Sequence, residues 1–218
     1  MLSKNYPDLD INYSQHLPES KSARILDFGC GDGRVVGFLN EKGYSLLEAT
    51  DIDSQLVDHV NAEFKVEAYP LSQFNERKRQ LANQFDMIIA KDVIYYLELK
   101  DLNELLLTFK RLLKPGGTLL VEIFNGSIFT GPFVMHKDLG ILHTFTEHSL
   151  EQVLLDANYN IISLQGNKFP TRGIKSMVFN MLQFVWRSVL QFIYFLERGI
   201  DSQNPKILNR KIIVVAKA

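Results

Sequence analysis

Short apolar runs alternate along this chain with segments whose apolar residues recur at helical spacing. Five runs come first, at 23–29, 45–53, 64–70, 85–93 and 118–125, and two more follow at 160–166 and 210–218. Apolar residues recur at helical spacing in the segments 34–44, 54–64, 101–117 and 146–159. In the third of these segments, a Pro-Gly-Gly sequence is expected to end the helix. This alternation predicts parallel βαβ units, and therefore an α/β fold with a doubly wound sheet.

The size and composition of the chain favour one globular domain. It has 218 residues, of which 46% are hydrophobic and 22% charged, enough for one core but few for two ordinary domains. A net charge of −1 provides no general field for nucleic acid, so we expect no nucleic-acid partner. Residues 1–22 are polar and are interpreted as an N-terminal cap of the domain.

The sequence favours a cytoplasmic location. Cys30 is the only cysteine and cannot form an internal disulfide, which suits a reducing compartment. The first residues lack the pattern of a signal peptide, and no 18-residue stretch is free of strongly polar side chains. We therefore expect no spanning helix and no cleaved leader.

The segment 25–34, "ILDFGCGDGR", places Gly29, Gly31 and Gly33 directly after the first predicted strand. Glycine is suited to such a turn because it tolerates positive φ and lets a ligand approach the backbone. A dinucleotide fingerprint would have another glycine at Arg34, and no Gly-Lys-Ser/Thr follows as in a P-loop. The turn therefore predicts a nucleotide-like ligand, with a diphosphate disfavoured.

A carboxylate beyond the turn narrows the choice of ligand. Asp51 ends the second predicted strand, 18 residues past Gly33, where it could accept hydrogen bonds from ribose hydroxyls. Asp53 could serve instead, and either acid could simply cap the next helix.

These motifs resemble those of the class I S-adenosylmethionine-dependent methyltransferases. The resemblance is carried by "ILDFGCGDGR", "ATDID", "FDMIIAKDVIYYL", "LLKPGGTLLVEIF", "FTEHSLEQVLLDANYNIISL" and "KIIVVAKA". It covers roughly 22–165 and 207–218, and it implies a seven-stranded, mostly parallel Rossmann-like sheet with an antiparallel last strand. The implied cofactor is S-adenosyl-L-methionine, and no metal site is expected.

The resemblance also implies which residues bind the cofactor. Asp27 and the glycine turn would hold its methionine end, Asp51 its ribose, and Ile52 its adenine. Pro70 stands where relatives often have an acid for the adenine amino group, so the backbone of Leu71 is expected to replace that contact. The full predicted set is Asp27, Gly29, Cys30, Gly31, Gly33, Asp51, Ile52, Leu71 and Lys91. For Cys30, packing beside the ligand is favoured over a nucleophilic role, since no base stands next to it.

Methyl transfer to a hydroxyl needs alignment of the acceptor and a group that takes its proton. The candidates follow the fourth and fifth strands, and we predict Asp92, Asp138 and His143 as catalytic residues. Lys91, Tyr95, Tyr96 and His136 are further candidates, with Tyr95-Tyr96 standing where many relatives have Glu-His. Residues 125–146 are interpreted as a substrate lid.

The chain resembles a methyltransferase subgroup found with polysaccharide and glycolipid biosynthesis. The residues that match the pattern of that subgroup are Asn125, Asp138, Phe145 and Thr146. Gly140-Ile141 stands where that subgroup has a histidine. The expected function is methyl transfer to a hydroxyl of a sugar or glycan-linked intermediate. The alternatives are methylation of a lipid, quinone or small metabolite, or a non-catalytic cofactor-binding or scaffold protein.

The segment 167–206 interrupts the strand-helix rhythm and is interpreted as a hydrophobic helical insertion. Within 174–198, polar residues recur in steps of three, four and seven, which places them on one narrow stripe of a helix: Ser176, Asn180, Gln183, Arg187, Gln191 and Arg198. The wide apolar face opposite could cover the domain's own sheet, pair with a second copy, or contact a membrane surface peripherally.

Overall fold

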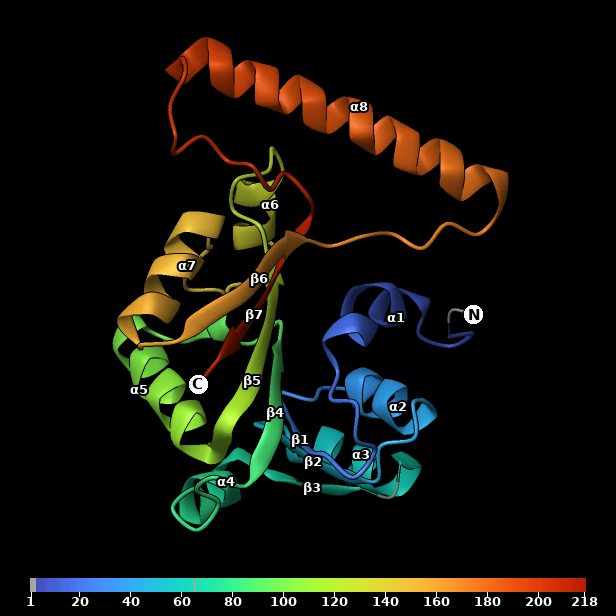
Figure 1. The fold of residues 1–218 in the computed structure, drawn as a ribbon, viewed down its shortest axis with the longest axis vertical. Helices are drawn as coiled ribbons and strands as arrows, with labels where there is room; N and C mark the ends of the chain where they lie inside the picture. Colours follow the sequence, from blue (N-terminus) through green and yellow to red (C-terminus); the bar gives the residue numbers. More distant parts are fainter. Residues whose placement is uncertain (1–2, 65) are drawn as a thin grey trace.

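The computed structural model describes residues 3–64 and 66–218 and contains one seven-stranded sheet (Figure 1). The strand order is β3-β2-β1-β4-β5-β7-β6, and β7 runs antiparallel to both of its neighbours, β5 and β6. The strands are β1 Arg24–Phe28, β2 Leu46–Asp51, β3 Glu67–Pro70, β4 Phe85–Lys91, β5 Leu113–Phe124, β6 Asn160–Gly166 and β7 Lys211–Lys217. The predicted doubly wound sheet with an antiparallel last strand is confirmed.

Helices cover both faces of the sheet (Figure 1). On one face lie α1 Pro7–Tyr13, α2 Arg34–Glu41 and α3 Ser54–Phe64; on the other lie α4 Leu71–Arg77, α5 Leu99–Leu112 and α7 Glu147–Asp156. Each face has its own apolar core, because successive side chains of a strand point to opposite faces of the sheet. The short 3₁₀ helices are Ser14–His16 and Ile94–Tyr96.

The junction between α5 and β5 differs from the prediction. The helix ends at Leu112, before the Pro-Gly-Gly sequence, and Leu113 already pairs with Phe85 of β4. The cause is local: the residue that precedes Pro115 is disfavoured in helical geometry, and proline cannot donate the next helical hydrogen bond.

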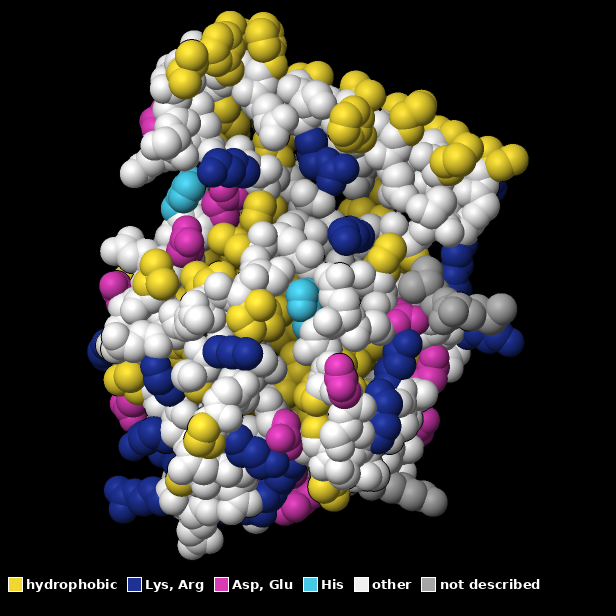
Figure 2. Space-filling view, in the orientation of Figure 1, with side chains coloured by type: hydrophobic (Ala, Val, Ile, Leu, Met, Phe, Trp, Pro, Cys, Tyr) yellow, Lys and Arg dark blue, Asp and Glu magenta, His cyan; other side chains and the backbone are white. Residues whose placement is uncertain are grey.

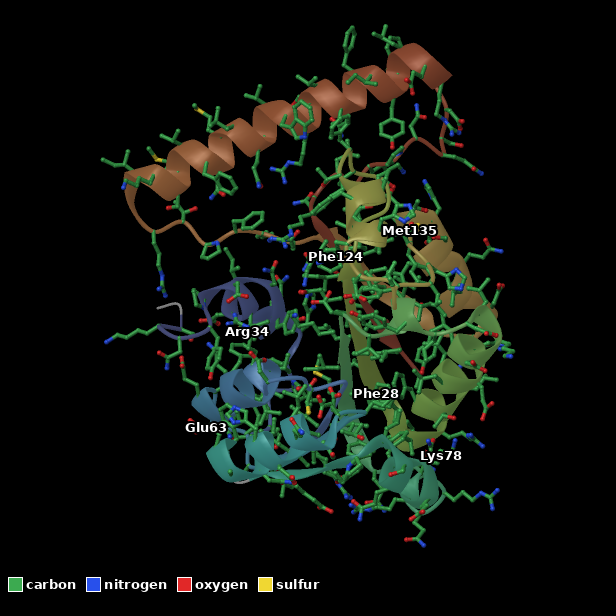
Figure 3. The ribbon with its side chains drawn as sticks, turned by 180° about the vertical axis from the view of Figure 1, so that it is seen from behind. Phe28, Arg34, Glu63, Lys78, Phe124 and Met135 are labelled. Carbon is green, nitrogen blue, oxygen red and sulfur yellow. The ribbon has the colours of Figure 1, made fainter. Side chains whose placement is uncertain are left out.

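The segment 125–146 contains α6 Gly131–His136 and joins β5 to α7. Asn125 forms an isolated bridge with Phe145, and the Gly126 amide donates to the Phe145 carbonyl at 2.8 Å. The two ends of this segment therefore lie together, as in a compact loop. Figure 3 places Phe124 at the end of β5 and Met135 on α6.

The helix expected over 174–198 is α8 Gly173–Arg198, and it lies apart from the sheet along one end of the molecule (Figure 1). Leu190 is its only buried residue. The alternative in which this helix covers the domain's own sheet is therefore wrong. Among the described helices, none has the length and apolarity needed to cross a membrane.

Candidate functional site

A cavity of about 840 Å³ lies at the carboxyl ends of β1, β2 and β4. Its lining comes from the glycine turn after β1, the end of β2, the segment after β4, and helices α4 and α5. Figure 3 labels three lining residues from different elements: Phe28 of β1, Arg34 of α2 and Lys78 beside α4. The volume and the position at a parallel sheet's carboxyl edge are those of a small-molecule site.

The glycine turn is built as the sequence predicts. The amides of Gly29 and Cys30 donate to the carbonyl of Thr50 at 2.8 and 3.1 Å, which ties the turn to the end of β2. At Gly29 φ is +77°, and a Cβ would lie 2.0 Å from Val93, so no larger residue fits. At Gly31 φ is +53°, and a Cβ would meet no protein atom within 4 Å. The turn thus leaves open space beside the cavity where a ligand can approach the backbone.

Asp51 and Asp53 have separate roles. Asp51 lines the cavity; its Oδ2 accepts from the Gly31 amide at 2.8 Å and its Oδ1 from the Asp53 amide at 3.0 Å. Asp53 is outside the cavity lining, and its Oδ1 accepts from the Gln55 amide in the first turn of α3. Asp53 is therefore the helix cap, and Asp51 is the one of the two carboxylates that lines the cavity.

Asp27 is buried in the floor of the cavity, and its side chain lacks a hydrogen-bond partner in the part of the chain that the structure describes. Its side chain is 1% exposed, and neither carboxylate oxygen is hydrogen-bonded within the described residues. Burial raises the pKa of Asp27 to about 7, against the opposing effect of Lys91 and with added repulsion from Asp51. A buried carboxylate without a partner is costly, so a cationic or hydrogen-donating group of a ligand would satisfy it.

Among the described residues that line the cavity, negative charges outnumber positive ones. Six acidic side chains line it, namely Asp27, Asp32, Asp51, Asp92, Asp101 and Glu104. Three basic side chains line it, namely Arg34, Lys78 and Lys91. Such a lining favours a ligand with positive charge and disfavours a diphosphate.

The other predicted cofactor-binding residues divide into two groups. Cys30, Ile52, Leu71 and Lys91 line the cavity, whereas Gly33 does not and caps the start of α2 with φ +81°. Burial raises the pKa of the Cys30 thiol well above its usual value, which keeps the thiol protonated and favours the packing interpretation.

Asp92 lies in the cavity wall within a network of charges. Its Oδ2 accepts from Lys91 Nζ at 2.6 Å and from Lys211 Nζ at 2.5 Å, while its Oδ1 is buried without a partner among the described residues. Burial alone would raise the pKa of Asp92, but Lys211 and Lys91 hold it below its ordinary value. A carboxylate that is held ionised in this way is a weak proton acceptor.

The network extends behind Asp92 through residues that the sequence analysis did not identify. Lys211 also donates to Glu122 Oε1 at 2.8 Å, and Glu122 Oε2 accepts from the Tyr13 hydroxyl at 3.0 Å. The sequence does contain one indication of this network, which is Glu122 inside the otherwise apolar run of β5. A buried acid is usually paired, so its position predicts a basic or hydrogen-donating partner.

Asp138 and His143 lie outside the cavity lining. Asp138 is exposed; its Oδ2 accepts from the hydroxyl of Tyr96, which lines the cavity, at 2.8 Å. The amides of Leu142 and His143 donate to the carbonyl of Tyr95 at 2.9 and 3.3 Å, which aligns this part of the 125–146 segment with Tyr95. The catalytic roles of Asp92, Asp138 and His143 stay predictions.

Asn125 has a structural position. Its Nδ2 donates to the carbonyls of Ile207 and Asn209 at 2.7 and 3.0 Å, and its Oδ1 accepts from the Ser127 amide. It therefore fixes the start of the 125–146 segment to the chain that returns from α8 to β7.

Comparison with known proteins gives a consistent result. A family model described as a methyltransferase domain matches residues 8–164. Phosphoethanolamine N-methyltransferase of Plasmodium falciparum (isolate 3D7) is 31% identical over 104 residues, 47% of this chain and 39% of that protein. A Bacillus subtilis (strain 168) protein named as methyltransferase YqeM is 30% identical over 178 residues, 78% of this chain and 62% of that protein. The chain thus spans less than two thirds of the length of these curated relatives.

Solved structures share the fold. A SAM-dependent methyltransferase from Archaeoglobus fulgidus superposes with a TM-score of 0.67 at 16% identity, covering 90% of this chain and 86% of that one. An S-adenosylmethionine-dependent methyltransferase from Mesorhizobium loti gives a TM-score of 0.64 at 17% identity, covering 97% and 98% of the two chains.

Proposed function

This chain belongs to the methyltransferase-domain family, and on that premise we propose that it transfers the methyl group of S-adenosylmethionine to a hydroxyl of a sugar or glycan-linked intermediate. One observation carries the choice of cofactor: an acidic cavity whose buried floor residue, Asp27, accepts no hydrogen bond from any described residue. A ligand with an ammonium and a sulfonium group suits that cavity, whereas a nicotinamide dinucleotide would bring a diphosphate into it.

The described residues fit the cofactor from one end to the other. Asp27 would accept from the ammonium group of the methionine part, and the open space at Gly31 would leave room for that part beside the turn. Asp51 keeps lone pairs free for the ribose hydroxyls, and Ile52, 83% exposed at the cavity, offers an apolar surface to the adenine. When bound, the cofactor supplies a methyl group already activated by the sulfonium.

The remaining task of the chain is to orient the acceptor and to exclude water, which supplies on the order of 7–11 kcal/mol in well-aligned reactions. Asp92 is better suited to positioning than to proton transfer, because two lysines keep it ionised. The Tyr96–Asp138 pair presents hydroxyl and carboxylate groups between the cavity and the 125–146 lid. Such a pair suits an acceptor with several hydroxyls, and it supports the sugar or glycan class and the glycan-related subgroup.

A second candidate acceptor is the amine of a small metabolite. The relative from Plasmodium falciparum is named for N-methylation of phosphoethanolamine, and the acidic lining would attract a cationic amine as well as the cofactor. A quinone or lipid acceptor would instead use the apolar surface of α8 and the lid.

The first experiment is a binding titration with S-adenosylmethionine, S-adenosylhomocysteine and NAD. We expect the first two to bind and Asp51→Ala to weaken both roughly 10- to 100-fold, because a charge-assisted hydrogen bond is worth about 1.5–3 kcal/mol. The matched control is Asp53→Ala, which removes a helix cap outside the cavity. Tight binding of NAD without response to the other two ligands would refute the proposal.

The second experiment identifies the acceptor. Formation of S-adenosylhomocysteine is measured with a panel of sugar nucleotides, glycolipids, ethanolamine phosphate and quinones. Turnover with a sugar or glycolipid supports the proposed class, and turnover only with ethanolamine phosphate or a quinone replaces it. Cofactor binding without turnover on any class favours a non-catalytic cofactor-binding protein.

A further inference from the structure

The amphipathic helix α8 has its polar side toward the protein and its apolar side toward solvent. Its least exposed positions follow one stripe, Ser176, Asn180, Gln183, Arg187, Leu190 and Tyr194, and four of these six are polar residues from the predicted stripe. Asn180 Nδ2 donates to Thr171 Oγ1 at 2.8 Å, and the Tyr194 hydroxyl donates to the Ser127 carbonyl at 2.8 Å. A helix that simply completed a domain would have the opposite orientation.

The outward face of α8 is apolar along its whole length, about 39 Å for 26 residues. Its exposed members include Met181, Leu182, Val185, Val189, Phe192 and Leu196. Figure 2 shows hydrophobic side chains in an almost continuous row along the outer edge of the molecule, with basic side chains beneath them. A contiguous apolar surface of this kind marks a place where another body covers the protein.

The apolar surface continues from α8 onto the lid. The rings of Trp186 and Phe129 contact edge to face with centroids 6.1 Å apart. Phe129 is 75% exposed and Phe133 of α6 is 70% exposed. The exposed apolar surface therefore includes both α8 and the 125–146 segment that follows β5.

The net charge of the insertion, residues 167–206, indicates what kind of partner this apolar surface would bind. Residues 167–206 contain six lysine and arginine residues and two acidic residues, a net charge of +4, whereas the whole chain has a net charge of −1. The rest of the chain therefore has a net charge of −5. The basic residues are Lys168, Arg172, Lys175, Arg187, Arg198 and Lys206. Arg187 lies in the stripe that faces the protein and Arg198 pairs with Asp201, whereas Lys168 and Lys175 are exposed. An apolar face with an excess of cations beside it is attracted to an anionic lipid surface, and a second copy would bring like net charges together.

Both ends of the insertion are fastened to the body. Asn12 exchanges two hydrogen bonds with the backbone of Lys168, at 2.9 and 2.8 Å. The carboxylate of Glu147 accepts from the amides of Lys206 and Ile207 at 3.0 and 2.6 Å. Because α8 is held at both ends, a surface that binds it also fixes the orientation of the domain.

We propose that α8, with Phe129 and Phe133 of the lid, is a binding surface for an anionic lipid bilayer. The helix lies in the plane of the interface, with its outward face among the headgroups and upper acyl chains and its polar stripe against the protein. This binding needs neither the cofactor nor methyl transfer, so it can fail or hold independently of the proposed function.

The test uses the purified full chain and vesicles of phosphatidylcholine with or without phosphatidylglycerol. Trp186 is the only tryptophan and lies on α8, so its emission reports contact directly. We expect a blue shift and quenching by brominated lipid with the anionic vesicles, and much weaker signals with phosphatidylcholine alone. Raising the ionic strength from about 0.1 to about 1 M shortens the Debye length from about 10 to about 3 Å and should weaken binding.

Two sets of variants separate the apolar and electrostatic contributions, with co-sedimentation as the readout. The apolar test is Leu182→Gln, Val185→Gln and Leu196→Gln together, and its control is Leu46→Gln, Leu107→Gln and Leu155→Gln, exposed on other elements. We expect at least tenfold weaker vesicle binding for the test and less than twofold change for the control. The charge test is Lys168→Gln with Lys175→Gln, expected to weaken binding roughly fivefold per lysine, and its control is Lys21→Gln with Lys100→Gln.

Three outcomes would overturn the proposal. The first is absence of binding by the wild-type chain to anionic vesicles. The second is equal loss of binding in the test and control variants. The third is a dimer in analytical ultracentrifugation that the apolar variant abolishes, with no vesicle binding, which would assign this face to a second copy of the chain.

Discussion

Asp27 is a residue whose buried position raises its pKa and lowers the stability of the ligand-free protein at neutral pH. It is buried without a hydrogen-bond partner in the described structure, and burial raises its pKa to about 7. A carboxyl group that is easier to protonate in the folded state than in the unfolded state destabilises the fold above its unfolded pKa, near 3.8. A cationic ligand reverses this effect, because it pairs with the ionised form.

Asp27→Asn should therefore separate stability from binding. We expect the melting temperature of the ligand-free protein to rise by about 3–6 °C at pH 8, from a gain of about 1–2 kcal/mol, and affinity for S-adenosylmethionine to fall roughly 10- to 100-fold. Thermal unfolding and calorimetric titration measure the two effects. The stability gain should shrink as the pH falls from about 7 toward the unfolded pKa near 3.8, because the wild-type carboxyl is then protonated in the folded state and the energetic cost of its burial disappears. Asp51→Asn is the control: it should weaken binding without raising the melting temperature, because Asp51 is already hydrogen-bonded.

The same pKa predicts the pH dependence of cofactor binding. S-adenosylmethionine should bind the ionised form of Asp27, so affinity should increase as the pH rises toward about 7 and then become constant. Below that pH, affinity should fall by up to about tenfold per pH unit, since the ligand must displace a proton. Titrations from acidic to alkaline pH test this expectation. An unchanged slope in Asp27→Asn would assign the titration to another group.

Residues that act within one turn could be predicted from the sequence, and residues joined by the sheet could not. Gly29, Gly31 and Asp51 follow from a strand-turn-helix pattern whose geometry is local. The contact between Asp92 and Lys211 joins positions 119 residues apart and exists because β7 lies between β5 and β6. The periodicity of the sequence does not specify this strand order, and it therefore does not predict which lysine pairs with Asp92.

At the scale of elements, the insertion around α8 is held by a buried carboxylate at the start of α7. Glu147 is 4% exposed, and its two oxygens accept the amides of Lys206 and Ile207. Glu147→Ala leaves both amides without that acceptor, so we expect a loss of about 2–4 kcal/mol in the free energy of unfolding, measured in urea. Limited proteolysis should also cleave 199–206 more readily. Glu151→Ala, a partly exposed position on the same helix, should change the stability by less than about 0.5 kcal/mol.

The sequence predicted the existence of α8 and its polar stripe, and it did not predict its orientation. Hydrophobic periodicity shows that a helix has two unlike faces, but it contains no information on which face meets the protein. In the structure, hydrogen bonds of Asn180 and Tyr194 orient the helix. Their partners, Thr171 and Ser127, both lie outside α8, so the sequence of the helix alone does not specify them. The predicted helical segment 101–117 extends beyond the observed end of α5 at Leu112 for a simpler reason. Pro115 disfavours helical geometry at the residue before it, so the helix ends ahead of the Pro-Gly-Gly sequence.

At the scale of the whole molecule, α8 is the middle of an enlarged hairpin connection between two antiparallel neighbours. Asn167, just after β6, donates its amide to the carbonyl of Lys211 at 3.0 Å, and its side-chain oxygen accepts the Lys211 amide at 2.8 Å. The chain thus leaves and re-enters the sheet at almost the same place. Neither core of the sheet includes a buried residue of α8.

Replacing residues 171–204 with a Gly/Ser linker of about 20 residues should therefore leave the methyltransferase-type domain folded. The replacement keeps the contacts of Lys168, Lys206 and Ile207 and removes a helix with one buried residue. We expect the free energy of unfolding to change by less than about 1 kcal/mol, since surface elements contribute little to the core, and cofactor affinity to change less than twofold. Urea unfolding and calorimetry measure both. A collapse of stability would mean that α8 supports the fold, whereas retained cofactor binding with lost vesicle binding would show that the two surfaces of this molecule work independently.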